Sequence, residues 1–318
     1  MDERALLCLL ADGQTHSGAA LAHALGLSRA AVWKQIEALR AAGLPVQAEA
    51  GRGYRVTPAL QLLDAAALRR AAGSYWPQVE VPWRVDSTSS ELLRRAEDLP
   101  GGTALLAEWQ NAGRGRRGRT WLAPPLLGLT FSLLWRFTQG YAALAGLSLA
   151  MGVAVAETLR RHGADAVMLK WPNDLLHRGH KFGGILVELG GEFLGPCHAV
   201  IGIGLNLHLP DTLRAAAGQP VTDLAAACAG AVPARNALAA DLLLALGAAL
   251  TSFARDGFAA FASRYAALDA LAGRELQVES AGRSFRAHAQ GVDARGALQV
   301  RHAGELLSLD SAEVSVRA

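Results

Sequence analysis

The middle of the chain alternates short apolar stretches with helical ones, and this alternation constrains the fold more than any other feature. Apolar strands are expected at residues 102–110, 129–137, 167–171, 185–189 and 199–207. Helices are expected at residues 143–162 and from 234 to about 269. Because a sheet must bury its apolar face against another layer, the pattern predicts a mixed α/β domain, which we place at residues 66–268.

The first 60 residues carry a different pattern, three short helices followed by a hairpin. Ser17 and Ser28 each precede a predicted helix and can cap it, and Gly43 ends the third helix. Two short strands then flank a glycine turn that carries Arg52 and Arg55. This order is typical of a winged helix-turn-helix, in which a recognition helix enters the major groove of DNA.

The third helix has one apolar face and leaves another face available for DNA. Val32, Ile36 and Leu39 recur at the spacing of a buried stripe. Residues off this stripe and in the wing are the candidate DNA contacts, namely Ser28, Arg29, Trp33, Lys34, Arg52 and Arg55. Because positive and negative charges nearly balance in this segment, docking of a protein partner is the alternative.

The last segment, residues 269–318, carries only short alternating strands, between residues 275 and 317. Their spacing predicts a small SH3-like β-barrel. The predicted fold class is therefore α+β, with a winged helix-turn-helix at residues 1–60, the mixed α/β domain at 66–268 and the barrel at 269–318. A chain of 318 residues, 51% of them apolar, has the length and composition to bury such cores.

Composition excludes several classes of protein. The three cysteines lie far apart and the nine histidines are scattered, so neither a disulfide framework nor a protein-held metal is expected. The first residues lack the features of a signal peptide, and no stretch of about 18 residues is free of polar side chains. We expect a cytoplasmic protein without a membrane segment. The net charge of +3 is too small to identify a nucleic-acid partner.

The stretch AGRGRRGRTW, residues 112–121, fits the dinucleotide pattern G-x-G-x-x-G. That pattern requires a helix opening at the last glycine and an acidic residue about 20 positions further on. Here Pro124 and Pro125 interrupt the following segment, and no Asp or Glu occurs between Glu108 and Glu157. The sequence therefore excludes a Rossmann turn.

Four arginines separated by glycines remain in this stretch, and their charge favours a phosphate-bearing ligand. Fixing ten residues costs on the order of 10 to 20 kcal/mol. We therefore predict that the segment is mobile when empty and closes on its ligand. Taken alone, a flexible surface loop or a nucleic-acid-binding tract is an equal alternative.

Polar residues also stand at the ends of three other predicted strands. They occur in the stretches KWPND (170–174), KFGG (181–184) and GIGLN (202–206). Convergence of polar groups on strand ends from separate parts of a chain is typical of a ligand site. Each stretch taken singly is equally well explained as a turn with a solvated charge.

The motifs GRGRRG with Trp121, KWPND, K-x-G-G-I-L-V-E and G-x-G-x-N follow one another behind the winged helix. In this combination the chain resembles the bifunctional biotin-protein ligases that also repress biotin biosynthesis. Lipoate ligases share KWPND-like sequences, but the arginine-glycine loop favours biotin. The resemblance implies that biotin and MgATP form biotinyl-5′-adenylate, and that biotin then passes to a lysine of a biotin carboxyl carrier domain, as in acetyl-CoA carboxylase.

The resemblance also implies roles for residues of this chain. The catalytic candidates are Lys181, Arg114 and Arg116, which would hold the carboxylate and α-phosphate, and Asp174, which would act on the carrier lysine. Biotin would also contact Ser87, Thr88, Ser89, Gln110 and Gly115. The adenylate would be held by Arg116, Arg117, Arg119, Trp121, Asn173 and Asn206, and Mg²⁺ would arrive with ATP.

Three positions depart from the family's pattern. Ser89 stands where many members have asparagine, Leu126 where a glycine is frequent, and Thr130 where an aromatic residue is frequent. The family's regulation further implies a homodimer promoted by the adenylate, with two winged helices on operator DNA. The alternatives are a ligase whose winged helix no longer recognises an operator, and a ligand-sensing transcription factor without turnover.

Overall fold

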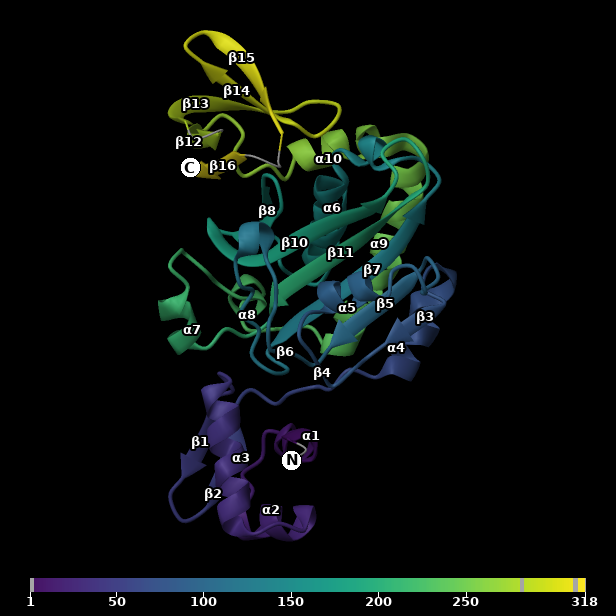
Figure 1. Ribbon diagram of the computed structural model, residues 1–318. Helices are drawn as coiled ribbons and strands as arrows, with labels where there is room; N and C mark the ends of the chain where they lie inside the picture. Colours follow the sequence, from purple (N-terminus) through teal and green to yellow (C-terminus); the bar gives the residue numbers. More distant parts are fainter. Residues whose placement is uncertain (1–2, 281–282, 311–313, 318) are drawn as a thin grey trace.

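The computed structural model describes residues 3–280, 283–310 and 314–317, and confirms the predicted α+β class. Figure 1 shows three groups of elements in a row, with the first helices at one end and the last strands at the other. Between them lies a seven-stranded sheet covered by helices.

The N-terminal group is a helix-turn-helix with a two-stranded wing. Its elements are α1 (Glu3–Leu10), α2 (Gly18–Leu25), α3 (Arg29–Ala41), β1 (Val46–Glu49) and β2 (Gly53–Val56). Ser17 Oγ accepts a hydrogen bond from Ala20 N at 3.1 Å, and Ser28 Oγ accepts one from Ala31 N at 3.2 Å. Both predicted caps therefore begin their helices. The predicted apolar stripe of α3 is buried.

The central sheet has the strand order β3-β5-β7-β11-β10-β9-β8. In that order the strands are Gln78–Glu80, Thr103–Ala107, Gly128–Phe137, Cys197–Asn206, His180–Gly191, Asp174–His177 and Val167–Lys170. β3 and β5 are parallel, and the other neighbours are antiparallel. Hairpin connections thus place β9 and β10, which carry two of the polar motifs, side by side.

Helices cover the two faces of this sheet unequally. One face packs against α4 (Ala65–Ala72), α6 (Leu147–Arg161) and α9 (Arg235–Asp256) in the largest apolar core. The other face carries α5 (Thr88–Arg94) and a smaller core that includes Leu92, Leu134 and Val200. Because side chains alternate along a strand, Ser132, Gly202 and Gly204 share this second face, where the candidate site lies.

Two helices begin or end elsewhere than the sequence predicts. The expected helix 143–162 is divided into η3 (Tyr141–Leu144) and α6, because Gly146 between them adopts φ +79°. A Cβ on Gly146 would lie 2.7 Å from Phe258 Cγ, so this turn requires glycine. The stretch after α9 continues as η4 (Gly257–Phe261) and α10 (Ala262–Ala266).

The expected strand 102–110 is interrupted at Glu108, which separates β5 from β6 (Trp109–Gln110). β6 leaves the main sheet and pairs with β4 (Arg84–Val85). Three short helices were not predicted from the sequence. η1 (Gly73–Tyr75) follows α4, and α7 (Asp211–Ala216) and α8 (Leu224–Ala227) follow β11.

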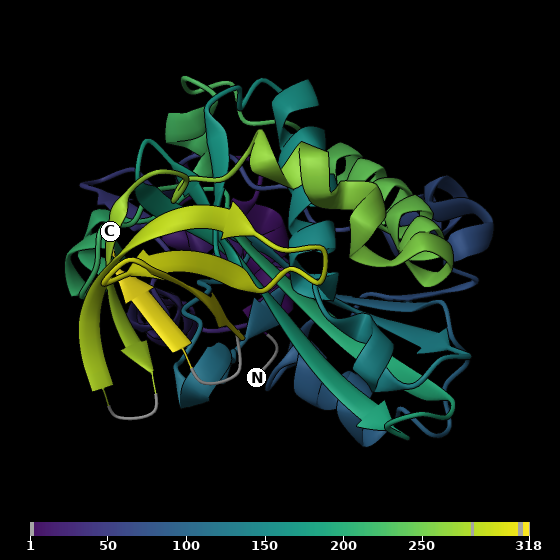
Figure 2. The ribbon, with the colours of Figure 1, turned by 90° about the horizontal axis from the view of Figure 1, so that it is seen from above.

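The C-terminal group is a five-stranded antiparallel sheet with the order β15-β14-β13-β12-β16. Its strands β12 to β16 are Glu275–Ser280, Arg283–Val292, Leu298–His302, Glu305–Leu309 and Val314–Arg317. Figure 2 shows it from above, with the central elements behind it. Trp171 Nε1 donates a hydrogen bond to Gly296 O at 3.1 Å, so this sheet is tied to the KWPND motif.

One helical run, Arg235–Ala266, is long and apolar enough to cross a membrane by length and composition. Half of its most apolar window is buried inside the structure. The core helix of a globular protein meets the same criterion, and here α9 packs on α4 and α6.

Candidate functional site

A cavity of ≈ 780 Å³ opens on the sheet face that carries α5. One wall is the arginine loop, residues 111–127, which connects β6 to β7. All the residues predicted for biotin and adenylate line this cavity: Ser87, Thr88, Ser89, Gln110, Arg114, Gly115, Arg116, Arg117, Arg119, Trp121, Asn173, Asp174, Lys181 and Asn206. The structure therefore brings together residues from five separate stretches, and their binding roles remain predictions.

The arginine loop folds back on itself as a narrow hairpin. Gly115 N donates to Arg119 O at 2.7 Å, and Trp121 N donates to Gly113 O at 2.9 Å. A Cβ on Gly113 would lie 2.4 Å from Trp121 O, so this close approach of two backbones requires glycine. Gly113 thus serves the hairpin itself. The predicted mobility of the empty loop stays a prediction.

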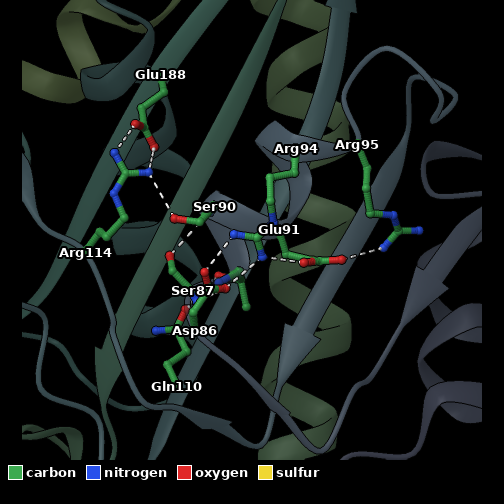
Figure 3. A network of polar contacts seen from close by, with 10 residues as sticks. Asp86, Ser87, Ser90, Glu91, Arg94, Arg95, Gln110, Arg114 and Glu188 are labelled. Carbon is green, nitrogen blue, oxygen red and sulfur yellow. Dashed lines mark hydrogen bonds and ion pairs between the residues drawn. The ribbon is translucent and has the colours of Figure 1, made fainter.

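Two loop arginines contact groups outside the loop. Arg114 forms two hydrogen bonds with the Glu188 carboxylate, at 2.5 and 3.2 Å, and a third with Ser90 Oγ at 3.3 Å (Figure 3). Arg116 donates to Asn173 Oδ1 at 3.3 Å. Burial lowers the pKa of Arg116, and the charge of Arg117 lowers it further, while Asp174 opposes both. An anion bound here would relieve this excess of positive charge.

Lys181 lines the cavity and contacts two of its other residues. It follows the β9–β10 turn, and its Nζ is 2.6 Å from Asp174 Oδ1. Its ammonium also lies 5.9 Å from the centre of the Trp121 ring. A cation, a carboxylate and an aromatic face from three motifs therefore meet at one point.

A chain of buried polar groups lines the cavity beside α5. Gln110 Oε1 accepts from Thr88 N at 2.7 Å and from Thr88 Oγ1 at 3.0 Å. Ser132 Oγ lies 2.7 Å from Thr88 Oγ1 and 2.9 Å from Ser89 Oγ. Ser87 Oγ accepts from Ser90 N at 3.4 Å and so caps α5. Such a network suits a ligand ring that carries both donors and acceptors.

The indole of Trp121 lies over β11. A Cβ on Gly204 would be 2.5 Å from Trp121 Cε2, so the indole can reach this strand because residue 204 is glycine. Nearby, Asn206 Nδ2 donates to Thr222 O at 3.2 Å, and Asn173 Nδ2 donates to Ile185 O at 3.0 Å. Each amide is thereby held in place by the backbone of a neighbouring segment.

Several contributors escaped the sequence analysis. Glu188 and Ser90 hold Arg114, and Ser132 joins the buried network. The segment around Val221, beyond α7, also lines the cavity, although the sequence analysis assigned it no role. Ser132 did leave a signal, because it is a polar residue between apolar neighbours, Phe131 and Leu133, in the middle of a strand.

The structure shows the backbone conformation or the contacts of the three positions that depart from the family's pattern. Leu126 adopts φ +60°, which explains why glycine is frequent there. Its side chain is 2% exposed and joins the apolar core of the N-terminal group, together with Leu127. Thr130 lines the cavity, and Ser89 is hydrogen-bonded to Ser132.

Within the described residues, no group of three His, Cys, Asp or Glu can hold a metal ion.

The candidate DNA contacts lie on the surface of the N-terminal group. Ser28, Arg29, Trp33 and Lys34 are exposed on α3, and Trp33 is 56% exposed despite its size. In the wing, Arg52 and Arg55 lie 3.2 and 3.6 Å from the carboxylate of Glu49. The two wing arginines are therefore partly neutralised, and their contact with DNA remains a prediction.

Three family descriptions match successive parts of the chain. Residues 3–55 match an HTH domain, residues 81–206 the biotin/lipoate A/B protein ligase family, and residues 272–317 the biotin protein ligase C-terminal domain. The chain is 40% identical to the bifunctional ligase/repressor BirA of Salmonella typhimurium, over 98% of this chain and 97% of that protein.

Other relatives agree with this assignment. The biotin–[acetyl-CoA-carboxylase] ligase of Mycobacterium tuberculosis is 34% identical over 79% of this chain and 95% of its own length. The biotin protein ligase from Aquifex aeolicus in complex with biotin and ATP superposes with a TM-score of 0.65, at 25% identity, over 76% of this chain and 99% of that one. The chain therefore belongs to the family of bifunctional biotin-protein ligases and biotin repressors.

Proposed function

We propose that this protein activates biotin with MgATP at the cavity and passes it to a lysine of a biotin carboxyl carrier domain. One observation carries the proposal. Among the residues that the structure describes, six cationic side chains line the cavity, and Asp174 supplies the single carboxylate of the lining. The cations are Arg114, Arg116, Arg117, Arg119, Lys170 and Lys181. Such a site suits two anions that must approach each other.

In the first step the biotin carboxylate attacks the α-phosphorus of ATP and pyrophosphate leaves. The carboxylate is already ionised at neutral pH, so the obstacle is repulsion between anions rather than removal of a proton. We assign Lys181 to the point where carboxylate and α-phosphate meet, since it lines the cavity beside both Asp174 and Trp121. Arg114 and Arg116 would neutralise the remaining charge from the loop side.

The rest of the cavity would bind the two substrates. The buried network of Ser87, Thr88, Ser89 and Gln110 offers donors and acceptors to the ureido ring of biotin. On the other side, Trp121 would cover the adenine and Asn206 would form hydrogen bonds with its polar edge. The phosphates or ribose would be held by Arg117, Arg119 and Asn173, with Mg²⁺ bound to ATP.

In the second step the carrier lysine attacks the adenylate and AMP leaves. A free lysine with a pKa of about 10.4 is neutral on the order of once in a thousand molecules at pH 7. Asp174 would orient the incoming amine and accept its proton. When Lys181 contacts the ligand anions, it leaves the Asp174 carboxylate free for that role.

The winged helix adds a second activity, binding of operator DNA through α3. The exposed side chains of Arg29, Trp33 and Lys34 share one helix surface and would enter the major groove. Ligand binding would promote a homodimer, which places two winged helices on two half-sites in the cytoplasm, where the DNA and the carrier protein both occur.

Biotin-dependent exchange of labelled pyrophosphate into ATP tests the ligase half of the proposal. We expect exchange with the wild-type protein and a loss of at least 100-fold with Lys181→Ala, measured on folded samples. Biotin binding without any exchange would contradict the ligase and favour a ligand-sensing repressor instead.

A further inference from the structure

A buried ion pair outside the cavity holds the base of the arginine loop. It joins Glu108, the residue between β5 and β6, to Arg235, the first residue of α9. Both side chains are 4% exposed, and Arg235 Nη1 donates to Glu108 Oε2. Replacement of such a pair by apolar residues is often neutral or stabilising, so a structural role alone gives little reason for it.

The pair contacts both ends of the loop. Glu108 O accepts a hydrogen bond from Leu126 N at 3.0 Å, just before the loop ends. Arg235 Nε donates to Gly128 O at 3.1 Å, directly after the loop. Glu108 also lies two residues before Gln110, which directly precedes the loop. One ion pair therefore fixes the distance between the two ends of the loop.

The same two side chains hold the linker, residues 57–64, that connects the winged helix to α4. Glu108 Oε1 accepts from Leu63 N at 2.6 Å, and Arg235 Nη1 donates to Gln61 O at 3.1 Å. The next residue, Asn236, donates through Nδ2 to Leu62 O at 2.7 Å. Three segments that are far apart in the sequence thus meet at one buried charge pair.

We infer that Glu108 and Arg235 are positioning residues for the biotin and adenylate site, an inference that rests on the proposed function. Neither residue lines the cavity. They act by fixing the two ends of the loop, which brings Arg114 and Arg116 over the ligand. When this pair is weakened, the loop ends separate more freely, and the ligand pays a larger entropic cost to close the loop.

Two variants test the inference on the full-length protein. Glu108→Gln keeps the size of the side chain and an acceptor for Leu63 N, but removes the charge that faces Arg235. The paired change Glu108→Gln with Arg235→Met leaves no unpaired buried charge, and so keeps the test valid if the single variant does not fold. Glu157→Gln, which breaks the more exposed Glu157–Arg264 pair between α6 and α10, is the matched control.

Three quantities are measured for each folded variant: the KM for biotin, kcat at saturating biotin, and the rate at which trypsin cleaves the loop arginines, with and without biotin and ATP. We expect Glu108→Gln and the paired variant to raise KM at least tenfold and cleavage of the liganded loop at least fivefold, with kcat changed less than threefold. The control is expected to match the wild type in all three.

The outcomes separate this inference from the proposed function. Wild-type values of KM and of loop cleavage in both variants would overturn the positioning role and leave a pair that only stabilises the core. If the wild-type protein forms no adenylate, the proposed ligase activity is wrong. In that case the empty loop still tests the positioning role. Faster trypsin cleavage in both variants than in the wild type would support it, and equal rates would contradict it.

Discussion

The ammonium of Lys181 lies 2.6 Å from the carboxylate of Asp174, with each side chain 21% exposed. The two residues belong to neighbouring antiparallel strands, β10 and β9, in which Lys181 pairs with Leu176 and Asp174 with Gly184, so the long lysine side chain spans the offset between them. In the proposed reaction Lys181 serves the first step and Asp174 the second. In this proposal the pair would link the two half-reactions, because each residue would be released from the other when Lys181 contacts the ligand.

Asp174→Asn is expected to slow transfer from the adenylate to the carrier lysine at least tenfold at pH 7. The amide cannot accept the proton of the incoming ammonium. The difference in transfer rate between variant and wild type should become smaller towards pH 9.5, where neutral lysine is more abundant. Single-turnover transfer from preformed adenylate measures both effects. An equal defect at every pH would mean that Asp174 only supports Lys181.

Gly204→Ala is expected to raise the KM for ATP about tenfold with a smaller effect on the KM for biotin. The added Cβ would lie 2.5 Å from Trp121 Cε2 and would displace the indole, which is proposed to cover the adenine. Steady-state kinetics with each substrate varied in turn give the comparison. A rise confined to the KM for biotin would contradict the placement of adenine beneath Trp121.

Leu126→Gly is expected to destabilise the protein by about 2 kcal/mol, the difference between the midpoints of two opposing effects. Glycine removes roughly 1 to 2 kcal/mol of left-handed backbone strain, whereas loss of a buried leucine side chain costs roughly 2 to 5 kcal/mol. The packing loss wins because Leu126 lies in the core of the winged helix, at φ +60°. Urea unfolding measures the change, and a stabilised variant would show that strain outweighs packing.

Lys34→Ala is expected to weaken binding to operator DNA, because an exposed lysine on α3 would neutralise a phosphate. The salt dependence of the binding constant should fall by about one released counterion. Ligase activity should be unchanged, since α3 contributes nothing to the lining of the cavity. Fluorescence anisotropy at several salt concentrations gives the slope. Arg70→Ala, an exposed change on α4, is the control, and an equal loss in both variants would argue against a recognition role for α3.

Local patterns predicted a large part of the fold. Ser17 and Ser28 cap their helices, and the apolar stretches form the strands of the central sheet. The division of the helix at Gly146 was missed, because the reason for it is the distant Phe258 ring rather than any neighbour in sequence. Short-range periodicity carries no record of such contacts.

The candidate site shows the same limit. Its loop and strand-end motifs stand out because their polar residues occur at unusual places in an apolar sequence. Glu188 ends the K-x-G-G-I-L-V-E motif, but its partner could not be predicted, because only the fold brings it to Arg114. Glu108 and Arg235 likewise meet from positions far apart along the chain.

Mass spectrometry of a biotin carrier domain, after incubation with this protein, biotin and MgATP, tests the central claim most directly. The account predicts a mass increase equal to one biotinyl group with the wild-type protein and none with folded Lys181→Ala. An unmodified carrier domain in the presence of folded wild-type protein, across several carrier domains, would contradict it.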